Sequence, residues 1–174
     1  MPGGLGIDAS SGVGYGANMT DDARPRYNYR ELNELDALDV DHLISLHAIE
    51  LGGEVLYSAI ADRLGHDEAA ALLRRNGREE AGHARRLARA IKIKQGDFDP
   101  KQVDDPQPVT LPERIDANFL RIIMQVEFDG DAGYQRWADN EPDPAVQRLL
   151  RLNGREESIH GRRVGQALAL LGDS

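Results

Sequence analysis

The feature of this sequence that most constrains its fold is an internal repeat with an offset of 77 residues. Residues 72–86 and 149–163 are identical at 11 of 15 positions and align without a gap. The same offset relates four further pairs of residues: Glu50 and Glu127, Gly53 and Gly130, Glu54 and Asp131, Tyr57 and Tyr134. We therefore expect two equivalent halves that superpose about a pseudo-two-fold axis.

Each half also contains metal-binding residue types at the same spacing. A lone glutamate is followed thirty residues later by a Glu-x-x-His pair. Two lone glutamates and two such pairs, each on its own helix, are the ligand set of a carboxylate-bridged dimetal centre in a four-helix bundle. A single Glu-x-x-His is usually a solvated charge pair, but its duplication in register with the lone glutamates favours the metal site. The predicted ligands are Glu50, Glu80, His83, Glu127, Glu157 and His160.

Apolar residues at intervals of three and four predict a helical fold. The expected helices lie near residues 38–64, 67–95, 111–140 and 143–172. Thr110 and Glu113 have the spacing of a capping box at the start of the third helix. Asp143 is the expected N-cap of the fourth, with Pro144 in its first turn.

The connection between the second and third helices decides how the two halves are arranged. It runs from Gln95 to Leu111, and its 17 residues reach ~56 Å when extended. A bundle of this kind is ~40 Å long, so the connection can cross its full length or loop to an adjacent helix start. A pseudo-two-fold axis requires the crossing. We therefore predict an all-α antiparallel four-helix bundle with a long crossover.

Composition narrows the class of protein. The 174 residues fit one domain, which we place at residues 31–174, after a Gly- and Ser-rich tail at residues 1–30. A net charge of −9 argues against nucleic acid or an anionic membrane as partner. No stretch approaches ~18 apolar residues, and no Lys or Arg precedes Arg24, so neither a membrane span nor a Sec signal is expected. The expected location is the cytoplasm.

Glutamate and histidine side chains suit iron, with manganese as the second choice. We expect Glu80 and Glu157 to bridge two metal ions, Glu50 with His83 at one metal and Glu127 with His160 at the other. Four carboxylates neutralise two divalent cations. Without metal, the buried acids would raise one another's pKa.

Several neighbouring residues are weaker candidates. Tyr57 and Tyr134 lie two turns after the lone glutamates, where each phenol can bond a ligand carboxylate of the other half or simply fill the core. Asn76 and Asn153 precede Glu80 and Glu157 by four residues. They are either further contacts of the ligands or marks of a helix irregularity.

The charged and small residues beside the site each have more than one possible role. Glu54 and Asp131 are either extra ligands or members of an ion-pair belt. His47 lies three residues before Glu50. We expect it to be a hydrogen-bonded histidine of the bundle interior, and a metal ligand or a proton shuttle is the less favoured alternative. Gly53 and Gly130 either open space for a substrate or allow close helix packing. Four arginines are expected at solvated edges or in cross-helix pairs with acids: Arg85, Arg86, Arg162 and Arg163.

At these residues the chain resembles the ferritin-like superfamily, and within it the rubrerythrin-like and bacterioferritin-like di-iron proteins. The resemblance covers about residues 38–172 and rests on Glu-Ala-Gly-His at residues 80–83, Glu-Ser-Ile-His at 157–160, and the two Glu/Tyr pairs. It implies a ferritin-like bundle with a crossover between the second and third helices. It also implies a di-iron site that binds O2 or peroxide.

Three departures from these families shape the expected function. The chain has no cysteine, so it lacks the CxxC pairs of a rubredoxin domain and needs an unknown electron donor. Gly130 stands where rubrerythrins place a seventh carboxylate, which weakens the case for peroxide reduction. We also expect no fifth helix of the kind that helps to close a bacterioferritin cage, which disfavours storage in a 24-subunit shell.

We therefore expect a homodimeric di-iron or dimanganese redox protein that acts on O2 or H2O2, as an oxidase, peroxidase or ferroxidase. The alternatives are an iron-binding or storage protein with slow ferroxidase activity, a small di-iron hydroxylase, and a bundle that has lost its metals.

Overall fold

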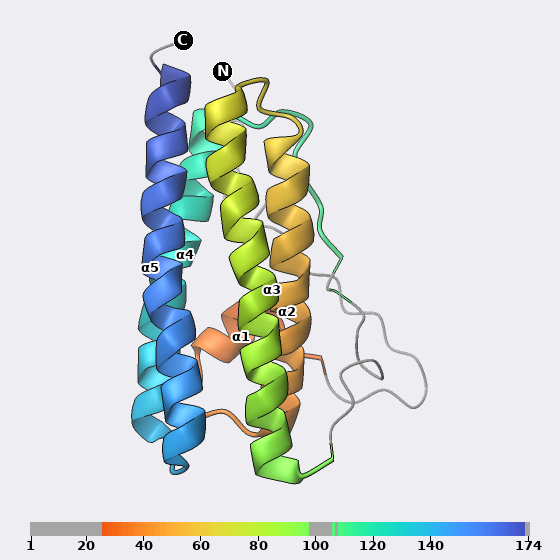
Figure 1. Cartoon of the computed structure of the whole chain (residues 1–174), viewed down its shortest axis with the longest axis vertical. Helices are drawn as coiled ribbons and strands as arrows, with labels where there is room; N and C mark the ends of the chain where they lie inside the picture. Colours follow the sequence, from red (N-terminus) through yellow and green to blue (C-terminus); the bar gives the residue numbers. More distant parts are fainter. Residues whose placement is uncertain (1–25, 98–105, 107, 173–174) are drawn as a thin grey trace, which may run out of the picture.

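The computed structural model of the chain describes residues 26–97, 106 and 108–172, and these residues form helices and no strands. The helices are α1 (Tyr29–Asn33), α2 (Val40–Ala61), α3 (Asp67–Gln95), α4 (Ala117–Asn140) and α5 (Pro144–Gly172). The four long helices form one bundle (Figure 1). In it α2 packs on α3, α4 packs on α5, and α3 packs on α5. The expected all-α four-helix bundle is confirmed.

The long crossover is also confirmed by the directions of the helices. In Figure 1, α3 ends at the opposite end of the bundle from the start of α4, so the two ends of the connection lie at opposite ends of the bundle. Helix α3 therefore runs parallel to α4, and α2 parallel to α5. This is the arrangement that places the two hairpins, α2–α3 and α4–α5, about a pseudo-two-fold axis.

Local signals explain where three of the long helices begin or end. Gly65 in the α2–α3 turn and Gly96 after α3 have φ angles of 64° and 85°, a region that L side chains avoid. Gly96, the C-cap residue of α3, has a ψ angle of −126°, a conformation that glycine adopts because it has no Cβ, and α3 ends there. The expected N-cap of α5 is confirmed, because Asp143 Oδ1 accepts hydrogen bonds from the backbone N–H groups of Ala145 (2.7 Å) and Val146 (3.2 Å).

The predicted start of the third helix is wrong by six residues. Helix α4 begins at Ala117, and its N-cap is Asp116, whose Oδ1 accepts from the N–H of Phe119 at 2.8 Å. Thr110 lies in the connection instead. Pro112 keeps the preceding residue, Leu111, out of the helical region, and the cap at Asp116 sets the start of α4. The carbonyl of Pro112 accepts a hydrogen bond from Arg63 Nη1 (3.1 Å), which ties the connection to the end of α2.

Helix α1 is an element that the sequence analysis did not predict. It begins at Tyr29 within the supposed tail, and Asn28 and Glu31 form a capping box, with hydrogen bonds of 2.8 and 3.0 Å. Leu32 is fully buried in the core. Residues 1–25 lie outside the described residues, so the tail itself stays a prediction.

The segment that carries α1 is attached to α4 by hydrogen bonds to backbone carbonyls. Arg136 donates to the carbonyls of Asn33 (2.6 Å) and Leu35 (3.1 Å), and the indole N–H of Trp137 donates to Leu35 (3.0 Å). Asn33 also accepts at its side-chain oxygen. Two adjacent residues of α4 therefore hold this segment against the bundle.

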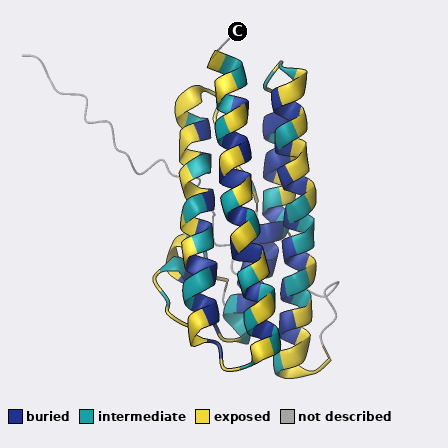
Figure 2. Ribbon diagram, turned by 60° about the vertical axis from the view of Figure 1, so that its left-hand side comes forward, coloured by how far each residue is buried: buried dark blue, intermediate teal, exposed yellow. Residues whose placement is uncertain are grey.

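The core consists of two apolar clusters at opposite ends of the bundle. One contains Leu43, Leu87, Trp137 and Leu150 together with Leu32 of α1. The second lies near the α2–α3 turn and consists largely of Leu56, Ile60, Leu73, Leu120, Ile123 and Val164. Figure 2 shows the buried residues on the inward faces of the long helices and the exposed residues on the outward faces. Between the clusters lies a layer of buried polar side chains.

Helix α2 is the most apolar of the four long helices, and its length and composition alone would allow it to cross a membrane. Of its most apolar stretch, 67% is buried inside the bundle. The core helices of soluble proteins have the same length and composition. Its apolar character therefore matches its position in the core, where it carries the buried Glu50.

Two helical glycines should respond in opposite directions to substitution by alanine. A Cβ at Gly154 would lie 2.9 Å from Tyr134 Cβ on the adjacent helix, whereas one at Gly82 would meet no atom closer than 3.7 Å. We expect Gly154→Ala to lower the free energy of unfolding by about 1–3 kcal/mol. Gly82→Ala should raise it by up to about 1 kcal/mol, since alanine favours the helix. Urea unfolding of the metal-free proteins measures both, and a stabilised Gly154→Ala protein would contradict the close α4–α5 contact.

Candidate metal centre

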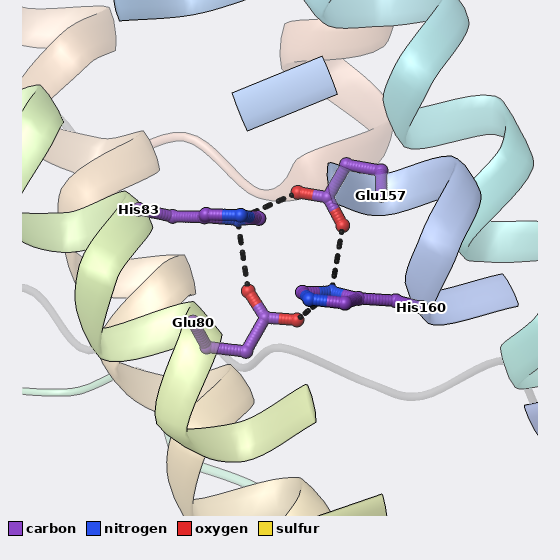
Figure 3. A group of neighbouring side chains, drawn as sticks. All are labelled: Glu80, His83, Glu157 and His160. Atoms are coloured by element: carbon purple, nitrogen blue, oxygen red, sulfur yellow. Dashed lines mark ion pairs between the residues drawn. The ribbon is translucent and has the colours of Figure 1, made fainter. Parts of the chain in front are cut away.

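The six predicted ligands converge in the polar layer between the apolar clusters, and all six are buried. Glu80 and His83 extend from α3 toward Glu157 and His160 of α5, as Figure 3 shows. One ligand atom from each of these four residues lies within 4.8 Å of the others. The equivalent positions of the two repeats therefore meet at one point.

The first histidine contacts three of the carboxylates through its Nδ1 atom. His83 Nδ1 lies 3.3 Å from a carboxylate oxygen of Glu50, 3.3 Å from Glu80 and 3.0 Å from Glu157. Its ring is stacked on that of His160, with ring centroids 5.1 Å apart and planes 15° apart. The Nδ1 atom, and not Nε2, is therefore the nitrogen that faces the centre.

The second histidine repeats this arrangement. His160 Nδ1 lies 3.0 Å from Glu80, 3.4 Å from Glu157 and 3.5 Å from Glu127. Glu80 and Glu157 are thus near both histidines, while Glu127 lies beside His160 alone, as Glu50 lies beside His83. This is the grouping expected for two bridging and two terminal carboxylates.

The two tyrosines cross between the halves. The Tyr57 hydroxyl donates to Oε1 of Glu127, and the Tyr134 hydroxyl donates to Oε1 of Glu50. Burial, and next the charge of the bonded glutamate, raises the pKa of each phenol well above its usual value. Both phenols therefore remain hydrogen-bond donors, and the contact expected from the sequence is present on both sides.

Each histidine is oriented by a glutamate that the sequence analysis did not single out. His83 Nε2 lies 3.0 Å from Glu156, and His160 Nε2 lies 3.1 Å from Glu79. The hydrogen bond to His83 is the largest cause that lowers the pKa of Glu156, to about 2. A carboxylate that accepts from Nε2 leaves the Nδ1 lone pair free for a metal. Glu79 and Glu156 are themselves related by the 77-residue offset, and this relation is the feature of the sequence that could have identified them.

Arginines and asparagines complete this outer layer. Arg86 pairs with Glu156, and its Nε donates to Asn153 Oδ1 at 2.5 Å. The equivalent Arg163 pairs with Glu79 and donates to Asn76 Oδ1 at 3.1 Å. These are the cross-helix pairs expected for two of the four arginines.

The asparagines also donate to the opposite half. The Asn76 amide donates to the carbonyl of His160 at 3.2 Å, and that of Asn153 donates to the carbonyl of His83 at 3.4 Å. Both helices continue through these asparagines, so the alternative of a helix irregularity is wrong.

The remaining candidates lie elsewhere. Glu54 is exposed. Asp131 accepts hydrogen bonds from Ser158 (2.5 Å) and Gln135 (2.8 Å). His47 is buried in α2, one turn before Glu50.

The paired glycines allow close packing of the bridging glutamates. A Cβ at Gly53 would lie 3.1 Å from Glu80 Cγ, and a Cβ at Gly130 would lie 3.3 Å from Glu157 Cγ. Any side chain at these positions would therefore press on a predicted ligand. At Gly130 the hydroxyl of Tyr29 is equally near, 3.2 Å from the same Cβ position. The sequence did not predict a role for this tyrosine, because residues 1–30 have the composition of a tail.

Burial of the terminal carboxylates is unfavourable without a cation. Burial is the largest cause that raises the pKa of Glu50 and Glu127 well above its usual value, and the negative charges of Glu80 and Glu157 raise it further. Both effects disfavour the ionised form. The site therefore has a deficit of positive charge.

Protons on the histidines supply part of that charge in the metal-free protein. Burial alone would lower the pKa of His160, but the carboxylates of Glu127, Glu157 and Glu80 beside its Nδ1 atom outweigh that effect and raise the pKa to about 12. Burial likewise opposes the charge on His83, yet the charge of Glu157 and further hydrogen bonds raise its pKa well above the usual value. Burial would raise the pKa of Glu80, but the close contacts with both histidines lower it.

The residues fit a pair of divalent cations. His160 Nδ1 is buried and makes no hydrogen bond of good geometry among the described residues, although three carboxylates lie within 3.5 Å. A nitrogen lone pair surrounded by carboxylate oxygens is a donor set for a metal ion. Four carboxylates would balance two divalent cations, which makes their burial tolerable.

Metal binding should therefore release protons. The imidazolium forms of His83 and His160 must lose the Nδ1 proton before that nitrogen can bind a metal. Because their pKa values are raised, we expect the apparent affinity for Mn(II) to rise with pH across the neutral range, about tenfold per pH unit for each proton released. Calorimetric titration in buffers of different ionisation enthalpy measures both quantities. An affinity independent of pH, with no proton release, would contradict protonated histidines.

Comparison with known proteins agrees with this geometry. A family model described as Rubrerythrin matches residues 45–169, which include all six converging residues. Searches of curated proteins and of solved structures found no significant match. The family match and the buried Glu/His cluster together indicate a binuclear metal site. The chain, which contains no cysteine for a rubredoxin domain, belongs to the Rubrerythrin family.

Proposed function

We propose that this protein is a di-iron redox protein that reacts with O2 or peroxide, with dimanganese as the alternative metal pair. The observation that supports this most is the reciprocal contact of each histidine Nδ1 with both Glu80 and Glu157 and with one terminal glutamate. Two iron ions bound there would supply the two electrons that reduction of a peroxide bond requires. Glu80 and Glu157 would bridge them.

The chain's own residues would serve this chemistry in three ways. Tyr57 and Tyr134 hold the terminal glutamates through hydrogen bonds, so those carboxylates keep their positions when the charge at the centre changes. Glu79 and Glu156 fix the imidazole rings. The apolar clusters on either side exclude water from the buried layer.

Gly130 bears on which oxidant is preferred. Since this position carries no carboxylate, we expect oxidase or ferroxidase behaviour at least as readily as peroxidase turnover. The electrons must come from a separate, unknown donor. The homodimer and the cytoplasmic location expected from the sequence stay predictions.

Removal of one terminal ligand should lower metal loading. We expect Glu127→Ala to retain about one metal ion or less per chain where the parent retains two, because the buried site loses a carboxylate that balances charge. Glu54→Ala is the matched control, since Glu54 is an exposed glutamate one turn after Glu50. Elemental analysis after desalting measures the content. Equal loading of the Glu127→Ala protein and the parent would refute the assignment of this ligand.

The reactivity can be tested with each oxidant separately. Stopped-flow mixing of the Fe(II)-loaded protein with O2, and in a second series with H2O2, follows the absorption of ferric iron. We expect at least one oxidant to oxidise the bound iron faster than the same concentration of Fe(II) in buffer. Should neither do so while two iron ions remain bound, passive iron binding would replace the redox proposal.

A further inference from the structure

A third tyrosine reaches the centre from outside the two repeats. Tyr29, the first residue of α1, has a buried hydroxyl that lies beside Gly130 and Glu157. Helix α1 lies across the bundle close to α2 (Figure 1), and its segment is held by Arg136 and Trp137 of α4. The position of this hydroxyl is therefore set by the fold.

The Tyr29 hydroxyl differs from the other two tyrosine hydroxyls at the centre. Those of Tyr57 and Tyr134 donate to the terminal glutamates. That of Tyr29 has no hydrogen-bond partner among the described residues. A buried hydroxyl without a partner is unfavourable, and such groups are uncommon in proteins. An acceptor that is not part of the described chain would satisfy it.

The hydroxyl is in its donor form at neutral pH. The usual pKa of a tyrosine phenol is about 10. A proton therefore remains on the oxygen at neutral pH. The group can donate one hydrogen bond toward the centre.

The tyrosine also makes the two sides of the centre unequal. Gly53 is the counterpart of Gly130, and the atoms nearest to a Cβ placed there all belong to Glu80. At Gly130 the nearest atom is the Tyr29 hydroxyl oxygen, and atoms of Glu157 follow. Within the described part of the chain, the Gly130 side alone has this additional donor, so the pseudo-two-fold symmetry ends there.

We propose that Tyr29 donates a hydrogen bond to the exchangeable small ligand of the dimetal centre, such as water, peroxide or another small anion, on the Gly130 side. This inference rests on the proposed function, because it requires bound metal. It adds a residue that touches the ligand and that lies outside both copies of the repeat. The absence of a side chain at Gly130 leaves the space for the hydroxyl.

The test uses azide as the probe, since it is a small anion that binds ferric iron and accepts hydrogen bonds. The full-length protein is loaded with iron, oxidised, and titrated with azide while the azide-to-iron charge-transfer band is recorded. We expect Tyr29→Phe to weaken azide binding about three- to tenfold, the loss typical of one hydrogen bond, with the iron content unchanged. Tyr27→Phe is the matched control, because it removes a hydroxyl from the same segment beside His42, and it should leave azide binding unchanged.

A second substitution separates the hydrogen bond from a general loosening of α1. Gly130→Ala adds a carbon 3.2 Å from the Tyr29 oxygen and should also weaken azide binding. In the Tyr29→Phe protein the same substitution should have a smaller effect, since residues in contact give non-additive changes. Thermal unfolding of each variant monitors the docking of α1.

The other possible results of these measurements would each count against the proposal. Equal azide affinity in the parent and the Tyr29→Phe protein, at equal iron content, would overturn the role of Tyr29 alone. A lower iron content with unchanged azide affinity would also overturn it, and would assign Tyr29 to holding a ligand carboxylate. Additive effects of Tyr29→Phe and Gly130→Ala would count against the contact. A parent protein that binds no iron would overturn the proposed function and this inference together.

Discussion

The burial of four carboxylates at one level of the bundle is the constraint on which the rest of the structure depends. Their mutual repulsion and their loss of solvation must be offset by positive charge. In the metal-free chain that charge comes from protons on His83 and His160, whose pKa values are raised for this reason. Two divalent cations would supply it in full, and the same nitrogens would then face metal instead of holding protons.

The two halves of the chain complete each other's part of the centre. The tyrosine of one half bonds the terminal glutamate of the other. Likewise, Glu156 orients His83, and Glu79 orients His160. Neither hairpin by itself contains a finished site, so packing of the hairpins and assembly of the centre are the same event. This interdependence is what a duplicated sequence produces when its copies pair about a two-fold axis.

The apolar clusters and α1 give the centre its environment. The clusters lie at the two ends of the bundle and keep the polar layer apart from solvent along the bundle axis. The segment that carries α1 adds a contact that the repeat does not supply, because Tyr29 approaches the centre on the Gly130 side only. Because Arg136 and Trp137 bind its backbone carbonyls, a short helix with little stability of its own holds Tyr29 in a defined place.

The sequence by itself determined the four long helices, the six converging residues and the crossover. Helical periodicity and an ungapped repeat are properties of local spacing, and local spacing places residues such as Glu50 and Glu80 at the same level. Only the tertiary structure decided the roles of Glu79 and Glu156, the start of α4 at Ala117, and the approach of Tyr29. Glu79 precedes a buried ligand by one residue, and its partner His160 lies on another helix. Such contacts depend on the rotation and packing of helices far apart in the chain, which spacing along one segment does not encode.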